Sequence, residues 1–390
     1  MSSPSLLTTL LILLVGVSLA RLSAGRLARW AVPVIVLELA VGFLLGNTVL
    51  PYEAIAPLSG LTELGVLTLF FQVGLEVRAD LLASRRATIA RMVALSFLAP
   101  LLAYGPLRSF GLAHAPALLC LAALSATGTG VTLRVLAQRK ALQTPSGRLL
   151  VGVSVLDDLP AIGLLSLAMA GAGRSLGPQG LAQRGLGALP LLLGLLFAAG
   201  SWWLVDRWAR GRPGSPSTVP SSPLAILMLL IGSAWLGEVS GLTSLLGALW
   251  GGVLLGRLAP PPRRVRQVLV VLSEVFLPLY FISVGMRIQA DTMRQPAAWS
   301  LAALLIVVAV LAKLACGLGI GARDRAAGVD RWLVVFGLMP RGLPGLVFAT
   351  TALGGGLINA VQFSALVLMV TTTTVLGLLL LERRLLQLGS

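Results

Sequence analysis

The chain has 390 residues, of which 57% are hydrophobic and only 11% are charged, and its mean hydropathy is +0.94. A soluble protein of this length needs more charge to cover its surface, so the composition predicts a membrane protein. The net charge of +16 does not indicate a nucleic-acid-binding protein, because the basic residues lie in short segments between apolar stretches. Two cysteines and one histidine argue against a disulfide framework, a metal cluster and a histidine-based pH sensor, and nothing in the sequence calls for a cofactor.

Apolar stretches long enough to cross about 30 Å of hydrocarbon recur from end to end. The first has no basic residues before it and is followed by further spans, so we interpret it as a helix rather than a signal peptide. The sequence therefore predicts an all-α polytopic membrane protein with 13 transmembrane helices. These lie at residues 5–20, 31–50, 58–76, 88–105, 114–136, 147–170, 186–206, 223–238, 241–257, 268–287, 297–320, 331–353 and 357–381.

Basic residues alternate between the two ends of these helices. Segments that follow odd-numbered helices carry 23 of the 30 basic residues, and segments that follow even-numbered helices carry five. Since basic loops stay in the cytoplasm, this asymmetry predicts an N-terminus outside and a C-terminus in the cytoplasm of a bacterial inner membrane.

The other two basic residues, Lys313 and Arg341, fall within or beside predicted spans. Charge at membrane depth is costly, so each is a candidate functional residue. Lys313 is one of only two lysines among 28 arginines, which indicates a group that must be able to lose its proton. A lysine whose ammonium reaches the membrane interface is the alternative. For Arg341 we predict a structural role, with its guanidinium satisfying carbonyls or a carboxylate such as Glu63 or Glu76.

Two adjacent carboxylates, Asp157 and Asp158, lie in the middle of the sixth predicted span. Neighbouring helix positions differ by about 100°, so one carboxylate can face a water-filled cavity while the other pairs with a basic residue. Burial and mutual repulsion favour the protonated form, so such a pair can exchange a proton for a cation. The alternative is a helix-end pair satisfied by backbone amides.

Two spans contain glycine and proline where a helix would be interrupted. The fifth contains Ser125, Thr127 and Thr129 among small residues, and the twelfth contains the segment 339–345 with two prolines and two glycines. Unwound backbone at membrane depth survives only where it lines a cavity or is buried in protein, and its hydroxyls and carbonyls are suitable sodium ligands. A kinked but unbroken helix is the alternative for each.

The interruptions occupy matching positions in the two halves of the chain. Each falls in the fifth helix of a six-helix unit, with the seventh helix as a linker, so the second unit enters the membrane from the opposite side. The positions predict two inverted repeats with the transport site at the paired interruptions.

Several segments resemble the monovalent cation:proton antiporters, especially their second branch. They are Leu64–Leu75 (LGVLTLFFQVGL), Ser125–Val135 (SATGTGVTLRV), Thr144–Ile162 (TPSGRLLVGVSVLDDLPAI), Leu277–Met286 (LPLYFISVGM) and Gly337–Thr350 (GLMPRGLPGLVFAT). The resemblance implies crossing broken helices, core ion-transport helices at 86–172 and 297–382, dimerisation helices at 1–82 and 223–290, a linker helix at 186–207, and a homodimer.

The same resemblance implies roles for individual residues. Asp158 would be the principal carrier of cation and proton, with Thr127 beside it as a sodium ligand. Asp157 would pair with Lys313. The tandem aspartates resemble the family's electrogenic members, whereas potassium-efflux relatives usually have Gln-Asp.

The sequence-based hypothesis is therefore exchange of Na⁺ or Li⁺ for protons by alternating access, with two protons per cation. Electroneutral K⁺/H⁺ exchange, a sodium-coupled organic-anion symporter and a membrane sensor or scaffold without transport are the alternatives. An enzyme is not indicated, because the sequence contains no nucleophile–base motif.

Overall fold

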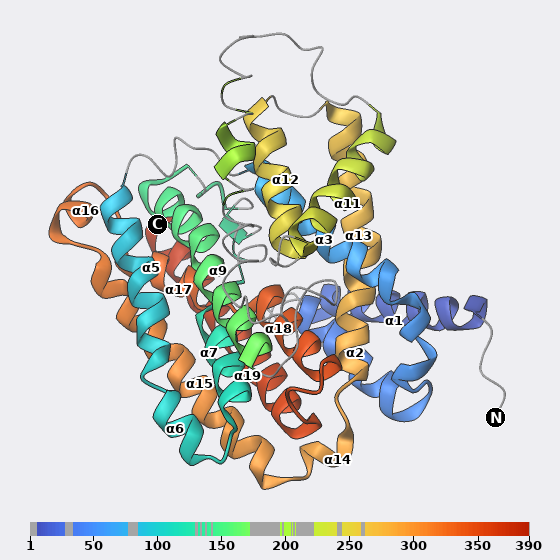
Figure 1. Cartoon of the computed structure of the whole chain (residues 1–390). Helices are drawn as coiled ribbons and strands as arrows, with labels where there is room; N and C mark the ends of the chain where they lie inside the picture. Colours follow the sequence, from blue (N-terminus) through green and yellow to red (C-terminus); the bar gives the residue numbers. More distant parts are fainter. Residues whose placement is uncertain are drawn as a thin grey trace. The chain divides into compact units, whose positions relative to one another are not determined.

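The computed structural model describes residues 6–27, 34–76, 85–128, 132, 135–136, 139–141, 143–171, 196, 199–203, 205, 207, 222–239, 244–258 and 262–389. All regular elements in these ranges are helical (Figure 1). The α-helices are α1 Leu6–Leu27, α2 Val34–Thr48, α3 Ser59–Glu76, α5 Arg86–Leu101, α6 Tyr104–Ser109, α7 His114–Ser125, α9 Pro145–Gly171, α11 Pro223–Val239, α12 Ser244–Leu258, α13 Arg263–Met286, α14 Ala290–Met293, α15 Pro296–Cys316, α16 Ala322–Ala326, α17 Arg331–Leu338, α18 Gly342–Gly354 and α19 Ala360–Gly389.

The long helices coincide with predicted apolar spans, but α1 and α19 extend seven and eight residues beyond their predicted ends, and α13 begins five residues before its predicted start. Five helical stretches in the described ranges are long and apolar enough to span a membrane, and four shorter apolar helices accompany them. A lipid environment favours helices in such apolar segments, because each helix satisfies its own backbone hydrogen-bonding groups. Most of the predicted linker helix, 186–207, lies outside the described residues, so the count of 13 helices stays a prediction.

The chain divides into two compact units. The first comprises Met1–Ile55, Asp80–Gly171 and Phe281–Ser390, and the second comprises Ala56–Ala79 and Ala172–Tyr280. These two units do not test the division into dimerisation and core helices that the family resemblance implies, and that division stays a prediction.

Glycines bring helix backbones into contact within each unit. In the second unit α3 packs against α12, and a Cβ at Gly74 would lie 2.1 Å from the Leu249 carbonyl oxygen. In the first unit a Cβ at Gly285 of α13 would lie 2.2 Å from the Leu39 carbonyl oxygen of α2. A real Cβ cannot approach a backbone oxygen so closely, so these helices pack at a distance that only glycine permits.

In the first unit, helices from both ends of the chain pack together. The helix α9 packs against α5, α7 and α17, and α15 packs against α5, α7 and α19. The helix α18 packs against α7 (Figure 1). Met92, Leu150 and Leu338 belong to one buried hydrophobic cluster shared by α5, α9 and α17. This packing holds α5, α7, α9 and α15 around a common interior.

An acidic side chain ties α16 to α5. Arg85 donates a hydrogen bond to Asp324 Oδ1 at 2.7 Å, and Thr88 donates one to Oδ2 at 2.8 Å. Burial raises the pKa of Asp324, but the hydrogen bonds from Thr88, Arg85 and the Gly321 N–H lower it by more, so the pKa lies below its ordinary value. The charged form of Asp324 is the one that holds these elements together.

A second acidic side chain begins α17. Asp330 Oδ1 accepts a hydrogen bond from the Leu333 N–H at 2.6 Å and so caps the helix. Arg384 of α19 donates to both of its oxygens, at 2.6 and 3.1 Å. Burial raises the pKa of Asp330, but the hydrogen bonds from Arg384 and Leu333 more than offset this, so the pKa lies below its ordinary value.

Candidate functional site

Both predicted interruptions are real breaks. The helix α17 ends at Leu338 and α18 begins at Gly342. The helix α7 ends at Ser125, and Ala126 is extended, with φ −61° and ψ 150°. The two breaks contact each other, since the Gly128 N–H donates to the Pro340 carbonyl at 2.6 Å. The alternative of kinked but unbroken helices is therefore wrong.

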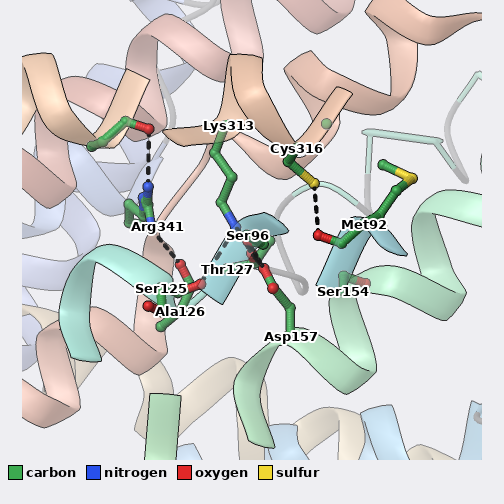
Figure 2. Close-up of polar contacts among 12 residues, drawn as sticks. Met92, Ser96, Ser125, Ala126, Thr127, Ser154, Asp157, Lys313, Cys316 and Arg341 are labelled. Carbon is green, nitrogen blue, oxygen red and sulfur yellow. Dashed lines mark hydrogen bonds and ion pairs between the residues drawn. The ribbon is translucent and has the colours of Figure 1, made fainter. Parts of the chain in front are cut away.

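Arg341 lies between the two halves of the twelfth predicted span and is fully buried. Its Nη1 donates to the Ala126 carbonyl at 3.1 Å and its Nη2 donates to the Ala309 carbonyl at 3.0 Å (Figure 2). The first carbonyl belongs to the α7 break and the second to α15. The expectation that this guanidinium satisfies carbonyls is confirmed, and Arg341 joins three elements around the breaks.

Lys313 projects from α15 toward the break after α7 (Figure 2). Its ammonium donates to Asp157 Oδ2 and Ser96 Oγ, each at 2.5 Å, and to Thr127 Oγ1 at 2.9 Å. The Ser125 carbonyl lies 3.4 Å away. The exposed fraction of the Lys313 side chain is 0%, so the alternative that its ammonium reaches the membrane interface is wrong.

Asp157 faces Lys313 from α9 with an exposed fraction of 1%. Its Oδ2 accepts hydrogen bonds from Thr127 at 2.5 Å and from Ser96 at 2.9 Å, besides the one from Lys313. Its Oδ1 is also buried, yet it has no hydrogen-bond partner among the described residues. One oxygen of the carboxylate is thus fully satisfied while the other has capacity for a further ligand or a proton.

The electrostatics of this cluster depend on compensation. A buried charge is tolerated only when it is paired and hydrogen-bonded, and Lys313 and Asp157 meet both conditions. With Arg341, the described charged groups of the cluster sum to a formal charge of +1. A further negative charge close by would balance them.

The structure brings together most of the predicted site residues. The predicted pairing of Asp157 with Lys313 is confirmed as a contact. Ser125 contributes its carbonyl, because its hydroxyl donates to the Leu121 carbonyl at 2.9 Å. The side chain of Asp158 and the whole of Thr129 lie outside the described residues, so their roles stay predictions.

Ser96 belongs to the cluster, and our sequence-based interpretation missed it. A serine inside an apolar span is unremarkable, and 217 residues separate it from Lys313. Pro100, four residues later, is the nearest sequence feature, but it bears on the Ser96 carbonyl and not on the hydroxyl that joins the cluster. Proline has no N–H, so it cannot donate to the Ser96 carbonyl as the helix would otherwise require.

Comparison with known proteins gives the family. The sequence model of the family described as sodium/hydrogen exchanger, transmembrane, matches residues 9–382. The chain is 27% identical over 333 residues to the high-affinity Na⁺/H⁺ antiporter NhaS3 of Synechocystis sp. (strain ATCC 27184 / PCC 6803 / Kazusa), covering 81% of this chain and 69% of that protein. It is 28% identical over 363 residues to the Na⁺/H⁺-K⁺ antiporter GerN of Bacillus cereus, covering 90% of each.

A solved structure supports the fold. The sodium proton antiporter MjNhaP1 from Methanocaldococcus jannaschii superposes with a TM-score of 0.65, covering 98% of this chain and 97% of that one. Its sequence identity is only 16%, so this likeness concerns the all-helical membrane fold alone. The family match extends over nearly the whole chain. The chain therefore belongs to the transmembrane sodium/hydrogen exchanger family, and it is a multi-pass transporter and not an enzyme.

Proposed function

We propose that this protein exchanges Na⁺ or Li⁺ for protons by alternating access, with Asp157, Asp158 and Lys313 at its transport site. The observation that carries the proposal is the fully buried Asp157–Lys313 pair beside two contacting helix breaks. Titratable charge at membrane depth marks transport pathways, and unwound backbone there supplies ion ligands. The names of NhaS3 and GerN, both sodium/proton antiporters, agree with this function.

Asp158 is the proposed principal carrier. It follows Asp157 in α9, so its position is rotated by about 100° from a carboxylate already engaged by Lys313. Its negative charge would balance the formal +1 of Lys313, Asp157 and Arg341. Protonating Asp158, or binding a monovalent cation to it, removes that balance in the same way. The two events therefore compete, which is what exchange requires.

The architecture that goes with this mechanism has 13 transmembrane helices in two inverted six-helix repeats. The breaks at Ala126–Gly128 and Met339–Arg341 are the paired interruptions of those repeats. The excess of basic residues after odd-numbered helices supports an N-terminus outside and a C-terminus in the cytoplasm of a bacterial inner membrane. The proposed functional unit is a homodimer, with 1–82 and 223–290 as its dimerisation helices.

Reconstitution in vesicles with a pH-sensitive dye tests the proposal. Addition of Li⁺ or Na⁺ should drive proton movement, and Asp158→Asn should abolish it because an amide cannot release a proton. Arg294→Gln is the matched control, since Arg294 is highly exposed and, among the described residues, its one ion pair is with the exposed Asp291. Turnover in Asp158→Asn equal to the control would remove this carboxylate from the mechanism.

The second candidate function is electroneutral K⁺/H⁺ exchange. It differs from the first in the transported cation and in moving no net charge. The name of GerN includes K⁺, which favours testing it. Titrating Li⁺, Na⁺ and K⁺ separately compares the cations. An imposed potential of 100 mV supplies about 2.3 kcal/mol per elementary charge moved. Exchange of two protons per cation should respond to that potential, and a rate independent of potential would favour the electroneutral candidate.

A further inference from the structure

We propose that Ser96 is a selectivity-determining cation ligand, completing an oxygen site that the Lys313 ammonium occupies in this structure. The proposal rests on the proposed function and deepens it. It assigns to α5 a direct part in binding the transported ion, which no feature of the sequence had indicated.

The first step is the geometry around Lys313 Nζ. Four oxygens surround it at 2.5, 2.5, 2.9 and 3.4 Å, and they come from α5, α9, the last residue of α7 and the break after α7. The set contains one carboxylate oxygen, two hydroxyls and one carbonyl. An ammonium and an alkali cation carry the same charge and both need oxygen neighbours. When the lysine withdraws, the same oxygens therefore suit a monovalent cation.

The second step is the unsatisfied carboxylate oxygen. Asp157 Oδ1 is buried and has no hydrogen-bond partner among the described residues, although Oδ2 of the same group accepts three hydrogen bonds. A buried acceptor without a partner has lost its hydrogen bonds to water without replacement, so a ligand that reaches it is favoured. A cation bound by this carboxylate could take Oδ1 as a ligand in addition to Oδ2.

The third step concerns the chemistry of Ser96. A hydroxyl has one donor and two acceptor lone pairs. Ser96 uses its donor on Asp157 Oδ2 and accepts from Lys313 (Figure 2). It can therefore keep orienting the carboxylate while one lone pair coordinates a cation. Because it is fully buried, water cannot readily replace it when it is removed.

The fourth step is selectivity. Discrimination between cations depends on cavity size, ligand number and flexibility. Coulomb attraction rises as the distance between charges falls, so a small ion gains more from each oxygen than a large one. Loss of Ser96 Oγ should thus weaken binding of Li⁺ most, Na⁺ less and K⁺ least.

The experiment compares Ser96→Ala with Ser96→Thr, which keeps the hydroxyl, and with Ser154→Ala as the matched control. Ser154 is a buried serine of α9 whose hydroxyl donates to the Val151 carbonyl of its own helix at 3.1 Å. Proton movement in vesicles gives the apparent KM and maximal rate for each cation. In Ser96→Ala we expect the KM for Na⁺ to rise about tenfold, the KM for Li⁺ to rise further, and the maximal rate to change by less than about twofold. Ser96→Thr should restore the KM, and Ser154→Ala should match wild type.

A binding measurement without transport keeps the test decisive. The rise in melting temperature on adding LiCl, NaCl or KCl is measured in detergent, with Ser96→Cys as a second variant of nearly unchanged volume. Both Ser96→Ala and Ser96→Cys should lose most of the Li⁺ and Na⁺ stabilisation. An unchanged Li⁺:K⁺ ratio in these variants, or an equal loss in Ser154→Ala, would overturn the proposal. Wild-type stabilisation by Na⁺ without proton movement would instead overturn the proposed function and leave the ligand assignment standing.

Discussion

The buried Lys313–Asp157 pair makes a quantitative prediction about stability. The variant Lys313→Met keeps most of the apolar stem and removes only the charge, so it strands the Asp157 carboxylate in the interior. At 2.5 Å and an effective dielectric constant of about 20, the attraction between the two charges is about 7 kcal/mol. Desolvation of both groups offsets much of this. Breaking such a pair costs about 3–5 kcal/mol, and that is the expected loss of unfolding free energy.

Removing the Asp157 charge as well should restore part of the lost unfolding free energy. In Lys313→Met with Asp157→Asn, no carboxylate is stranded, and the amide can still accept hydrogen bonds from Ser96 and Thr127. The double variant should therefore be more stable than Lys313→Met alone. The coupling between the two changes should be about 1–3 kcal/mol, as for groups in one network.

The assay is reversible unfolding in mixed detergent micelles, without transported cations, for wild type, both single variants and the double variant. The control cycle uses Arg294→Gln and Asp291→Asn, an ion pair whose side chains are 83% and 89% exposed. That pair should show no measurable coupling, since solvent screens it. Additivity of the Lys313 and Asp157 changes within about 0.5 kcal/mol would refute the pairing argument.

Three further predictions follow from other contacts. Arg341→Lys should lower folded yield and leave cation selectivity unchanged, because a lysine lacks the two separate nitrogens with which the guanidinium binds the two carbonyls. Normal yield with altered selectivity would contradict this. Because the pKa of Asp330 is depressed in the folded state, its stabilising contribution is present above about pH 4 and is lost as the pH falls through the folded-state pKa. The difference in melting temperature between wild type and Asp330→Asn should accordingly shrink below about pH 4. A difference that grows there would contradict the lowered pKa of Asp330. Gly285→Ala should cost about 1–3 kcal/mol or more, because its Cβ meets the Leu39 carbonyl, whereas Gly232→Ala, with nothing within 4 Å, should be tolerated.

Much of the fold was predictable because the bilayer restricts what a backbone can do. Within the described ranges, hydropathy located the long helices, although α1 and α19 extend seven and eight residues beyond their predicted ends and the short helices α14 and α16 were not predicted. The breaks were predictable for a related reason, since glycine and proline inside an apolar span are costly unless the unwound backbone is used. Lys313 was identifiable because a charge at membrane depth, in a chain that otherwise uses arginine, needs an explanation.

The local partners were not predictable, because they depend on how distant helices pack. Ser96 approaches Lys313 from 217 residues away, and a serine in an apolar span gives no warning of it. The carbonyls of Ala126 and Ala309 that bind Arg341 carry no side-chain signal. The open oxygen of Asp157 is likewise a property of the assembled cluster. Sequence thus identifies the costly groups, and packing decides which neighbours satisfy them.

The two buried cations show why one is a lysine and the other an arginine. Arg341 donates through separate nitrogens to two carbonyls on different elements, so its planar fork fixes the positions of both. Lys313 presents a single compact charge on a flexible stem to four oxygens around one point. At the ion site proposed above, a monovalent cation would resemble the ammonium in its compact charge, whereas it would not resemble a guanidinium, whose charge is spread over a plane. Arginine therefore suits a permanent link between the breaks, and lysine suits the exchange that we propose within the oxygen cluster.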